Sequence, residues 1–444
     1  MMKKILKLLA VIMCFSMAAV PFTGCAIERN KDIPSVREYL EQYVAEHGRS
    51  PYAGTEIRLM HFWSDAELFF DKFAKDYFEV LGVKVNVEFQ PPAGYLTVLN
   101  TKVQTGTVPE VFTMWPGASI RPYLGSNVML DLMDINFDCK ATMSQYARNA
   151  VTFDGYMPIL PVNNAFIGIA YNKDIFARHN LTPPKDLDDF ERIMDVIKTD
   201  SSIAYPIIYG TDTAQNMVYM MQLSVLYDKY PDFDERMAAG TINYNNPENQ
   251  FIYKKLYIDW SAKGYFNHDS FTTVDRMSAG AIQFTDGNAA MMHLGSWDIN
   301  VLNKLNDYNT PIGMFPMPGI DHKGNVVSAA GEAFAVSAAA DGNKKAAGIE
   351  LLNIIMSANI NGKICGLINS LSPYTNVEVE AAPDMITELN TYLNDKARGW
   401  NVSPTASQNK RGEAVNIIRA AAGNKQSVLD EHLDTIDRIW KESL

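Results

Sequence analysis

The chain has 444 residues, 47% of them hydrophobic and 20% charged, with 39 basic and 51 acidic side chains. This length and apolar content are enough for two domains of ordinary size, each with its own core. The formal net charge of −12 argues against nucleic acid as a partner, because nucleic-acid-binding surfaces are basic.

The first 25 residues are typical of an export signal. Three lysines precede an apolar run over residues 8–20 that is too short to span a bilayer, and the segment ends at Gly24-Cys25. This junction resembles the signal of bacterial lipoproteins, which implies cleavage after residue 24 and a lipidated Cys25 anchored to the outer face of the cell membrane. The alternative is an ordinary secretory signal with an incidental cysteine, which also leads outside the cytoplasm. Residues 25–54 are charged and turn-rich, with one weak helical stretch, and we expect a tether.

Order is predicted to begin with a strand, a helix and a second strand. Residues 56–62 form a short apolar strand, residues 64–67 a capping box, and residues 83–89 an alternating strand. The intervening helix has an apolar stripe at spacings of three and four residues, made of Phe69, Phe70, Phe73, Ala74, Tyr77 and Phe78. Strand, helix and strand in close order predict a parallel sheet and the α/β class.

The same alternation of patterns returns later in the chain. A helix is predicted over residues 186–199 with a strand over 205–210, and 289–293 form another short buried strand. A further helix is predicted over 341–357, and residues 410–440 are helical in pattern and divided into two helices at Gly423. A second α/β body is therefore expected.

Three stretches carry a resemblance to a known family: Gly106–Phe112, Ala170–Phe176 and Gly287–Trp297. The first resembles a turn into a strand that presents a binding loop, the second a crossing between lobes, and the third a strand that ends in a ligand-facing tryptophan. In this order and spacing the mature chain resembles the extracellular solute-binding proteins of ABC importers, in the group of maltose-binding protein and other oligosaccharide receptors.

The resemblance implies a two-lobed α/β fold of the periplasmic-binding-protein type, with an interlobe hinge and a ligand cleft. The chain is expected to cross between the lobes three times, near Phe166–Asn172, Gly331–Ala335 and Ser370–Tyr374. Lobe one would comprise residues 55–168 and 332–369, and lobe two 169–331 and 370–444. Cys139 and Cys365 would both lie in lobe one, either as free thiols or joined by one disulfide bond.

Candidate ligand-binding residues follow three strands. A sugar ring has apolar C–H faces and a hydroxyl edge, so its site needs aromatic rings together with carboxylates, amides or hydroxyls. Predicted loops offer both kinds of group as Trp63 with Asp65, Trp115 with Ser119, and Trp297 with Asp298. Glu332 lies beside a predicted crossing, where it either contacts ligand or is a solvated hinge residue. Asn163 and Tyr374 are added by the resemblance alone, and Arg398 and Trp400 are weaker additions.

These candidates also have structural interpretations. Any tryptophan can belong to a core, as we expect for Trp260 in a helical run, and Asp65 can stabilise a helix N-terminus.

The function expected from the resemblance is capture of an oligosaccharide by a monomeric receptor that delivers it to permease subunits, without catalysis, metal or cofactor. The alternatives are an exported glycoside hydrolase, since acids and aromatics also line hydrolytic sites, and a receptor for a peptide or polyamine. The sequence has no Gly-x-Ser-x-Gly motif of a serine nucleophile, no His-Glu-x-x-His zinc-binding motif and no phosphate-binding loop. Its seven histidines form no cluster with the spacing of metal ligands.

Overall fold

The computed structural model describes residues 33–208, 214–266, 279–305, 310–379, 384–393, 396–397 and 426–442. The chain divides into a short N-terminal unit that ends at Ser35 and one large compact unit that begins at Val36. The expected signal, Cys25, Arg398 and Trp400 lie outside the described residues. No helix within the described ranges is long and apolar enough to cross a bilayer.

Lobe one is built on a five-stranded sheet in the order β2-β1-β3-β10-β4. Its strands are β1 (Glu56–His61), β2 (Lys84–Phe89), β3 (Val111–Met114), β4 (Leu160–Pro161) and β10 (Ala333–Val336). Strand β1 pairs in parallel with β2 and β3, whereas β10 runs antiparallel to β3 and β4. The predicted parallel strand-helix-strand unit is confirmed, with α3 (Glu67–Leu81) as its helix.

Two details of the α3 prediction are wrong. Phe78 is 52% exposed, whereas the other five residues of the predicted stripe are buried together with Val80 and Leu81. The predicted capping box is absent, since Ser64–Ala66 forms a separate 3-10 turn and neither this turn nor α3 has a side-chain cap. The Asp65 carboxylate has a different partner, described below.

Part of the expected tether belongs to the folded unit. Residues Arg37–His47 form helix α2, which packs against α3 with Leu40 fully buried. Arg37 Nη1 donates to Glu79 at 2.5 Å, and the Ser50 hydroxyl donates to Glu350 at 2.5 Å. The compact unit therefore begins before the expected end of the tether at residue 54.

Lobe two contains the sheet β6-β7-β5-β8, with β9 also paired to β5. Its strands are β5 (Asn164–Asn172), β6 (Tyr205–Ile208), β7 (Ala289–Gly295), β8 (Ile312–Phe315) and β9 (Val327–Ala330). The predicted helix α7 (Leu187–Lys198) is confirmed, and its N-cap Asp186 accepts a hydrogen bond from the Asp189 amide. Trp260 is fully buried in the core of this lobe, as predicted.

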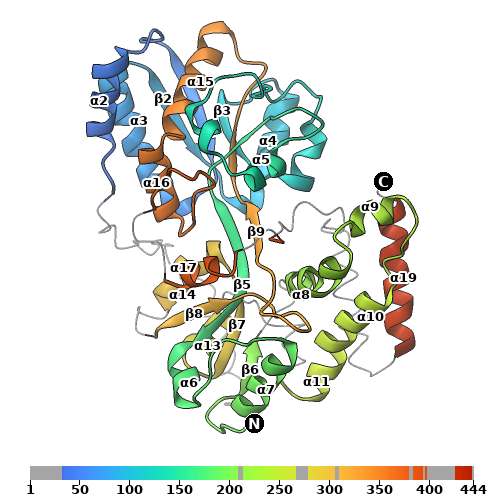
Figure 1. Cartoon of the computed structure of the whole chain (residues 1–444). Helices are drawn as coiled ribbons and strands as arrows, with labels where there is room; N and C mark the ends of the chain where they lie inside the picture. The colour runs from blue at the N-terminus through green and yellow to red at the C-terminus, as the bar shows by residue number, and fades with distance from the viewer. Residues whose placement is uncertain are drawn as a thin grey trace, which may run out of the picture. The chain divides into compact units, whose positions relative to one another are not determined.

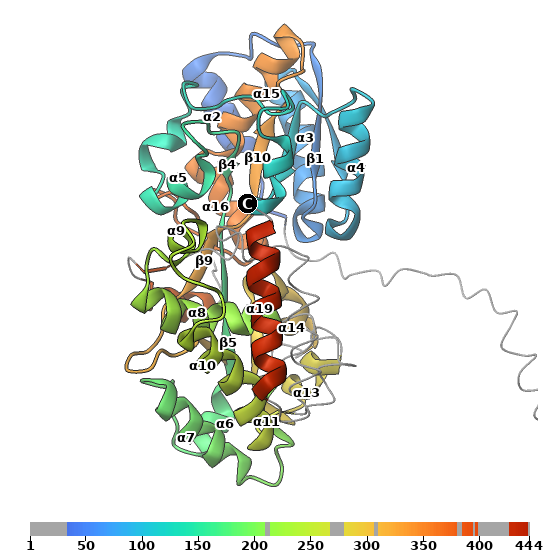
Figure 2. The ribbon, with the colours of Figure 1, turned by 90° about the vertical axis from the view of Figure 1, so that its right-hand side faces the viewer.

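The remaining helices of the described residues complete both lobes. They are α4 (Pro92–Gln104), α5 (Gln145–Val151), α6 (Lys173–Arg178), α8 (Ala214–Lys229), α9 (Phe233–Ala238), α10 (Pro247–Tyr253), α11 (Trp260–Ala262), α13 (Ala281–Thr285), α14 (Ile299–Leu305), α15 (Gly342–Ile355), α16 (Ala358–Leu367), α17 (Asp384–Asn390) and α19 (Gln426–Glu442). Helix α15 confirms the predicted helix over 341–357, and α19 confirms the second of the two helices predicted over 410–440, while the first lies outside the described residues. Helix α19 packs beside α10 (Figure 2).

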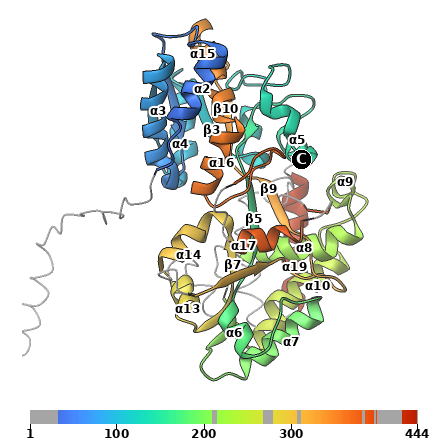
Figure 3. The ribbon, with the colours of Figure 1, turned by 60° about the vertical axis from the view of Figure 1, so that its left-hand side comes forward.

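The chain crosses from one lobe to the other three times: between β4 and β5, between β9 and β10, and between α16 and α17. Figure 1 shows β5 and β9 side by side where they leave one lobe for the other, and Figure 3 shows α17 in lobe two. The crossing segments are bonded to each other, because Gly331 N donates to Asn163 O at 2.8 Å and Asn164 N donates to Leu371 O at 2.7 Å. These bonds tie the three crossings into one hinge.

Both cysteines that the structure describes are free and buried. The Cys365 thiol contacts Val162 O at 3.3 Å, and burial raises the pKa of the Cys139 thiol to about 11. The disulfide left open by the sequence is therefore not formed in this structure, and both thiols serve as packing groups.

Candidate functional site

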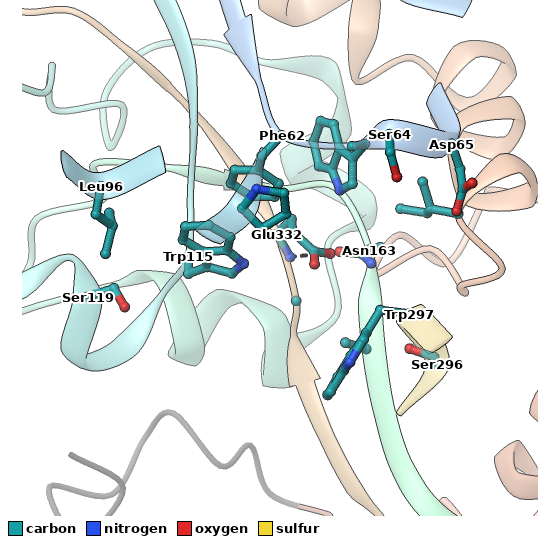
Figure 4. Close-up of a pocket in the computed structure, with 15 residues that line it drawn as sticks. Phe62, Ser64, Asp65, Leu96, Trp115, Ser119, Asn163, Ser296, Trp297 and Glu332 are labelled. Atoms are coloured by element: carbon teal, nitrogen blue, oxygen red, sulfur yellow. Dashed lines mark hydrogen bonds between the residues drawn. The ribbon is translucent and has the colours of Figure 1, made fainter. Parts of the chain in front are cut away.

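A cavity of about 500 Å³ lies between the sheets at the crossing segments. Its lining residues are Phe62, Trp63, Ser64, Asp65, Pro92, Leu96, Trp115, Ser119, Asn163, Ala165, Ser296, Trp297, Gly331, Glu332 and Ile368 (Figure 4). Seven of the nine predicted ligand-binding residues are in this set, and they come from both lobes. The volume is within the range of roughly 300–1,000 Å³ that is usual for small-molecule sites.

Lobe one supplies a rigid aromatic platform. The rings of Phe62 and Trp115 stack with centroids 4.0 Å apart and planes 3° from parallel. Tyr95 packs edge-on against both rings, and its hydroxyl donates to Thr113 O at 2.7 Å. The Trp115 ring is therefore held in one orientation before any ligand arrives. Phe62 was missed by the sequence prediction, although it precedes Trp63 at the end of the predicted strand.

Trp63 belongs to both the cavity wall and the core of lobe one. It is only 7% exposed and stacks on Phe70, with centroids 5.9 Å apart, while Phe334 meets it edge-on. The sequence allowed Trp63 to line the cavity or to belong to the core, and the residue occupies both positions.

Lobe two supplies Trp297, which is 41% exposed. It lies in the turn Ser296–Asp298, directly after β7. The Ser296 hydroxyl accepts a hydrogen bond from Phe166 N at 3.2 Å, which fixes this turn to β5. The indole lies over Gly295 so closely that a Cβ at that position would be 2.4 Å from the ring.

Gly295→Ala is expected to weaken ligand binding by about 1 kcal/mol, because the added methyl group forces the Trp297 ring out of its position. The backbone of Gly295, with φ −96°, suits alanine, so the fold should be retained. Isothermal titration calorimetry measures the change. The matched control is Gly342→Ala, where an added Cβ meets no atom within 4 Å, and equal losses in both variants would contradict the prediction.

Asp298 and Tyr374 do not line this cavity, contrary to the sequence expectation. Asp298 Oδ2 accepts a hydrogen bond from Gly295 N at 3.3 Å and so closes the turn that carries Trp297. Tyr374 is 3% exposed, and its hydroxyl donates to Pro161 O at 2.8 Å, on the lobe-one side of the hinge.

Glu332 and Asn163 form the polar floor of the cavity. Asn163 Oδ1 accepts a hydrogen bond from Glu332 N at 2.8 Å, and its Nδ2 donates to the Ser370 hydroxyl at 3.1 Å. Burial raises the pKa of the Glu332 carboxyl, and interactions with Asn163 and Trp63 oppose this rise. Figure 4 shows the two side chains together between Trp115 and Trp297. A ligand hydroxyl that donates to Glu332 would offset the cost of burying its charge.

Asp65 lies where the lobes meet at the edge of the cavity. Its Oδ2 accepts a hydrogen bond at 2.8 Å from Nδ2 of Asn300, in helix α14 of lobe two. The same amide group also donates to Leu367 O of lobe one, at 3.3 Å. Asn300 was missed from the sequence, because nothing in its local pattern indicates a partner 235 positions away.

The electrostatic character of the cavity is acidic to neutral. Its lining within the described part of the chain contains the carboxyl groups of Asp65 and Glu332 and no Lys, Arg or His. An anionic ligand would lose its hydration here without gaining a cationic partner. Among the described residues no group of three or more His, Cys, Asp or Glu side chains is placed to hold a metal ion.

Known proteins resemble this chain over part of its length. It is 26% identical to an uncharacterised ABC transporter extracellular-binding protein of Pyrococcus horikoshii. The match extends over 173 residues, which are 39% of this chain and 39% of the relative. It is 22% identical over 269 residues to the melibiose/raffinose/stachyose-binding protein MelE of Bacillus subtilis, covering 58% of this chain and 59% of MelE. The chain thus matches less than two thirds of the length of these relatives.

Solved structures share the fold over most of the chain. The solute-binding protein RafE in complex with raffinose has a TM-score of 0.66 at 20% identity, covering 87% of this chain and all of that one. A chitin oligosaccharide binding protein has a TM-score of 0.69 at 21% identity, with 88% and 98% coverage. The family model described as bacterial extracellular solute-binding protein matches residues 69–390. With its two-lobed fold and a cavity at the hinge, this chain belongs to the family of bacterial extracellular solute-binding proteins.

Proposed function

We propose that the protein captures a neutral oligosaccharide in the interlobe cavity and, as a monomer, delivers it unchanged to the permease of an ABC importer. The observation that carries this proposal is the pair of tryptophans on opposite lobes, Trp115 and Trp297, with Asn163 and Glu332 between them. Aromatic rings suit the C–H faces of sugars, and the polar pair suits their hydroxyl edges.

The names of similar proteins support a carbohydrate ligand. MelE is named for melibiose, raffinose and stachyose, a Streptococcus mutans relative is named a multiple sugar-binding protein, and RafE was solved with raffinose. All three ligands in the name of MelE are neutral, which agrees with a cavity whose described lining residues include no cation.

A polyamine would instead need charged carboxylates. The Asp65 carboxylate is already bonded to Asn300, and burial disfavours the charged form of Glu332. Both carboxyl groups can accept hydrogen bonds from ligand hydroxyls, and titration with spermidine separates the two classes of ligand.

Delivery requires that ligand binding change the relation between the lobes. A sugar that contacts Trp115 of lobe one and Trp297 of lobe two binds best when both surround it, and so shifts the population towards the closed state. The hydrogen-bonded crossings provide the hinge, and the permease would recognise the closed form.

The expected tether would keep the receptor at the membrane. Acylation of Cys25 would hold it near its permease and raise its effective concentration there. The family location outside the cytoplasm agrees with this arrangement.

Cys25→Ala is expected to release the protein from the cell surface into the surrounding medium, because the acyl chains are the proposed attachment. Fractionation measures the distribution, and mass spectrometry of the wild-type N-terminus measures the acyl mass on residue 25. Equal retention of variant and wild type would contradict the anchor and leave the binding proposal intact.

Calorimetric titration of the purified protein with raffinose, other neutral oligosaccharides, spermidine and an acidic peptide tests the binding proposal. Saturable binding of a neutral oligosaccharide, with the sugar recovered intact by chromatography, is the expected result. Binding of spermidine alone, or release of sugar fragments, would overturn it.

A further inference from the structure

A second cavity, of about 540 Å³, lies behind the hinge. Side chains alternate along an extended strand, and this alternation separates the two cavities. Asn163 and Ala165 line the interlobe cavity, whereas Asn164 between them lines the second one. The crossing segment 163–165, at the start of β5, thus forms a wall with a different cavity on each face.

The rear cavity is lined by both lobes and by the crossing segments. Tyr146 comes from α5 of lobe one, Ser328 from β9, Ser372 from the third crossing and Thr387 from α17 of lobe two. Helix α5 contacts β9, and Met143 forms an isolated bridge with Tyr374, so this wall is continuous across the hinge.

Two polar atoms of the lining are buried and form no hydrogen bond of good geometry with the described residues: the amide oxygen of Asn164 and the hydroxyl of Tyr146. Ser328 is the nearest polar neighbour of the Tyr146 hydroxyl and partly opposes the effect of burial on its pKa, so the Asn164 oxygen is the less satisfied of the two. Burial raises the pKa of Tyr146, so its hydroxyl stays protonated and can donate as well as accept. Because unsatisfied buried polar groups are costly, atoms that remain without partners next to a cavity indicate an occupant.

The lining specifies the charge of this occupant. Among the described residues that line the rear cavity none is Asp, Glu, Lys, Arg or His, so this lining offers an ion no countercharge. Leu371, Val377 and Leu393 add apolar surface for C–H groups.

We infer that the rear cavity is a second binding site, for a small neutral polyol or monosaccharide. A ligand hydroxyl donates to Asn164 Oδ1, a second one bonds to the Tyr146 hydroxyl, and the carbon chain packs on the apolar side chains. This assignment does not depend on the ligand of the interlobe cavity, because the two cavities share no lining residue.

The test uses xylitol as a neutral probe and xylonate as its anionic counterpart. Calorimetry is expected to show saturable binding of xylitol but not of xylonate. Tyr146→Phe, which removes one hydroxyl, and Asn164→Leu, which removes the amide, should each weaken xylitol binding about fivefold or more. Trp297→Ala should leave it unchanged, since Trp297 lines only the other cavity.

A crystal structure grown with xylitol locates the probe. Density for xylitol between Asn164 and Tyr146 supports the site, whereas water alone in the rear cavity overturns it. Binding that disappears in Trp297→Ala but persists in Tyr146→Phe assigns xylitol to the interlobe cavity and likewise overturns the inference. Thermal unfolding of Tyr146→Phe provides the folding control, and this variant keeps the test decisive if Asn164→Leu does not fold.

Discussion

Trp297→Ala is expected to weaken oligosaccharide binding by about 1–3 kcal/mol, a rise in Kd of roughly 5- to 150-fold. The side chain is 41% exposed in a turn beside the cavity, so truncation removes ligand contact area and little core packing. The melting temperature of the ligand-free protein should therefore change little. Calorimetry and thermal unfolding measure the two quantities separately.

Trp260→Ala is the matched control for this substitution. Trp260 is fully buried in the core of lobe two, where its indole nitrogen donates to Glu191 at 2.9 Å. Its loss should lower the free energy of unfolding by about 3–5 kcal/mol without removing a lining residue of the cavity. If Trp297→Ala instead kept its affinity and lost stability, Trp297 would be a packing residue.

His61 is expected to make the stability of the protein fall as the pH drops below about 6.5. Its ring lies among the rings of Phe70, Phe89 and Trp63, with centroid distances of 4.6, 5.6 and 6.3 Å. Neither ring nitrogen has a hydrogen-bond partner within the described residues. Burial in these apolar surroundings lowers the pKa of His61 to about 4.

The sign of the effect follows from the two protonation states. Between the unfolded pKa of about 6.5 and the folded pKa, the unfolded chain binds a proton that the folded protein rejects. The free energy of unfolding therefore falls with decreasing pH, by about 3 kcal/mol in total once the pH reaches 4. Above pH 6.5 His61 is neutral in both states and does not contribute to the pH dependence of the free energy of unfolding.

His61→Phe should remove this contribution, because phenylalanine fits an aromatic pocket and carries no titratable group. Urea unfolding of both proteins between pH 4 and 8 gives the difference, in which the carboxyl groups common to both proteins cancel. The wild-type curve should drop away from the variant curve below pH 6.5. Parallel curves over the whole range would show that His61 does not titrate differently in the folded state.

Local patterns predicted the elements and the loops of the site well. Strand β1, helix α3 and strand β2 follow directly from periodicity, and the tryptophans placed after predicted strands reach one cavity. Such residues could be predicted because the carboxyl ends of neighbouring strands converge, whatever the remaining sequence.

Roles that depend on distant partners could not be predicted. Asp65 looked like part of a capping box, but its partner Asn300 comes from the other lobe. Asp298 has the same polar character as a ligand contact, yet it bonds the backbone three residues earlier. Phe78 matched the helical stripe by spacing alone, whereas its exposure depends on what packs around α3.

The interrupted path of the chain also affects how the protein is made. Strand β10 lies between β3 and β4 in the sheet, where Ala333 pairs with both Met114 and Pro161. A nascent chain cannot complete the first lobe until most of the second has been synthesised, and closing so long a loop is slow. For a protein that works outside the cytoplasm, this delay lengthens the time during which the polypeptide is still unfolded and can be threaded across the membrane. The topology that creates the hinge thus also favours translocation before folding.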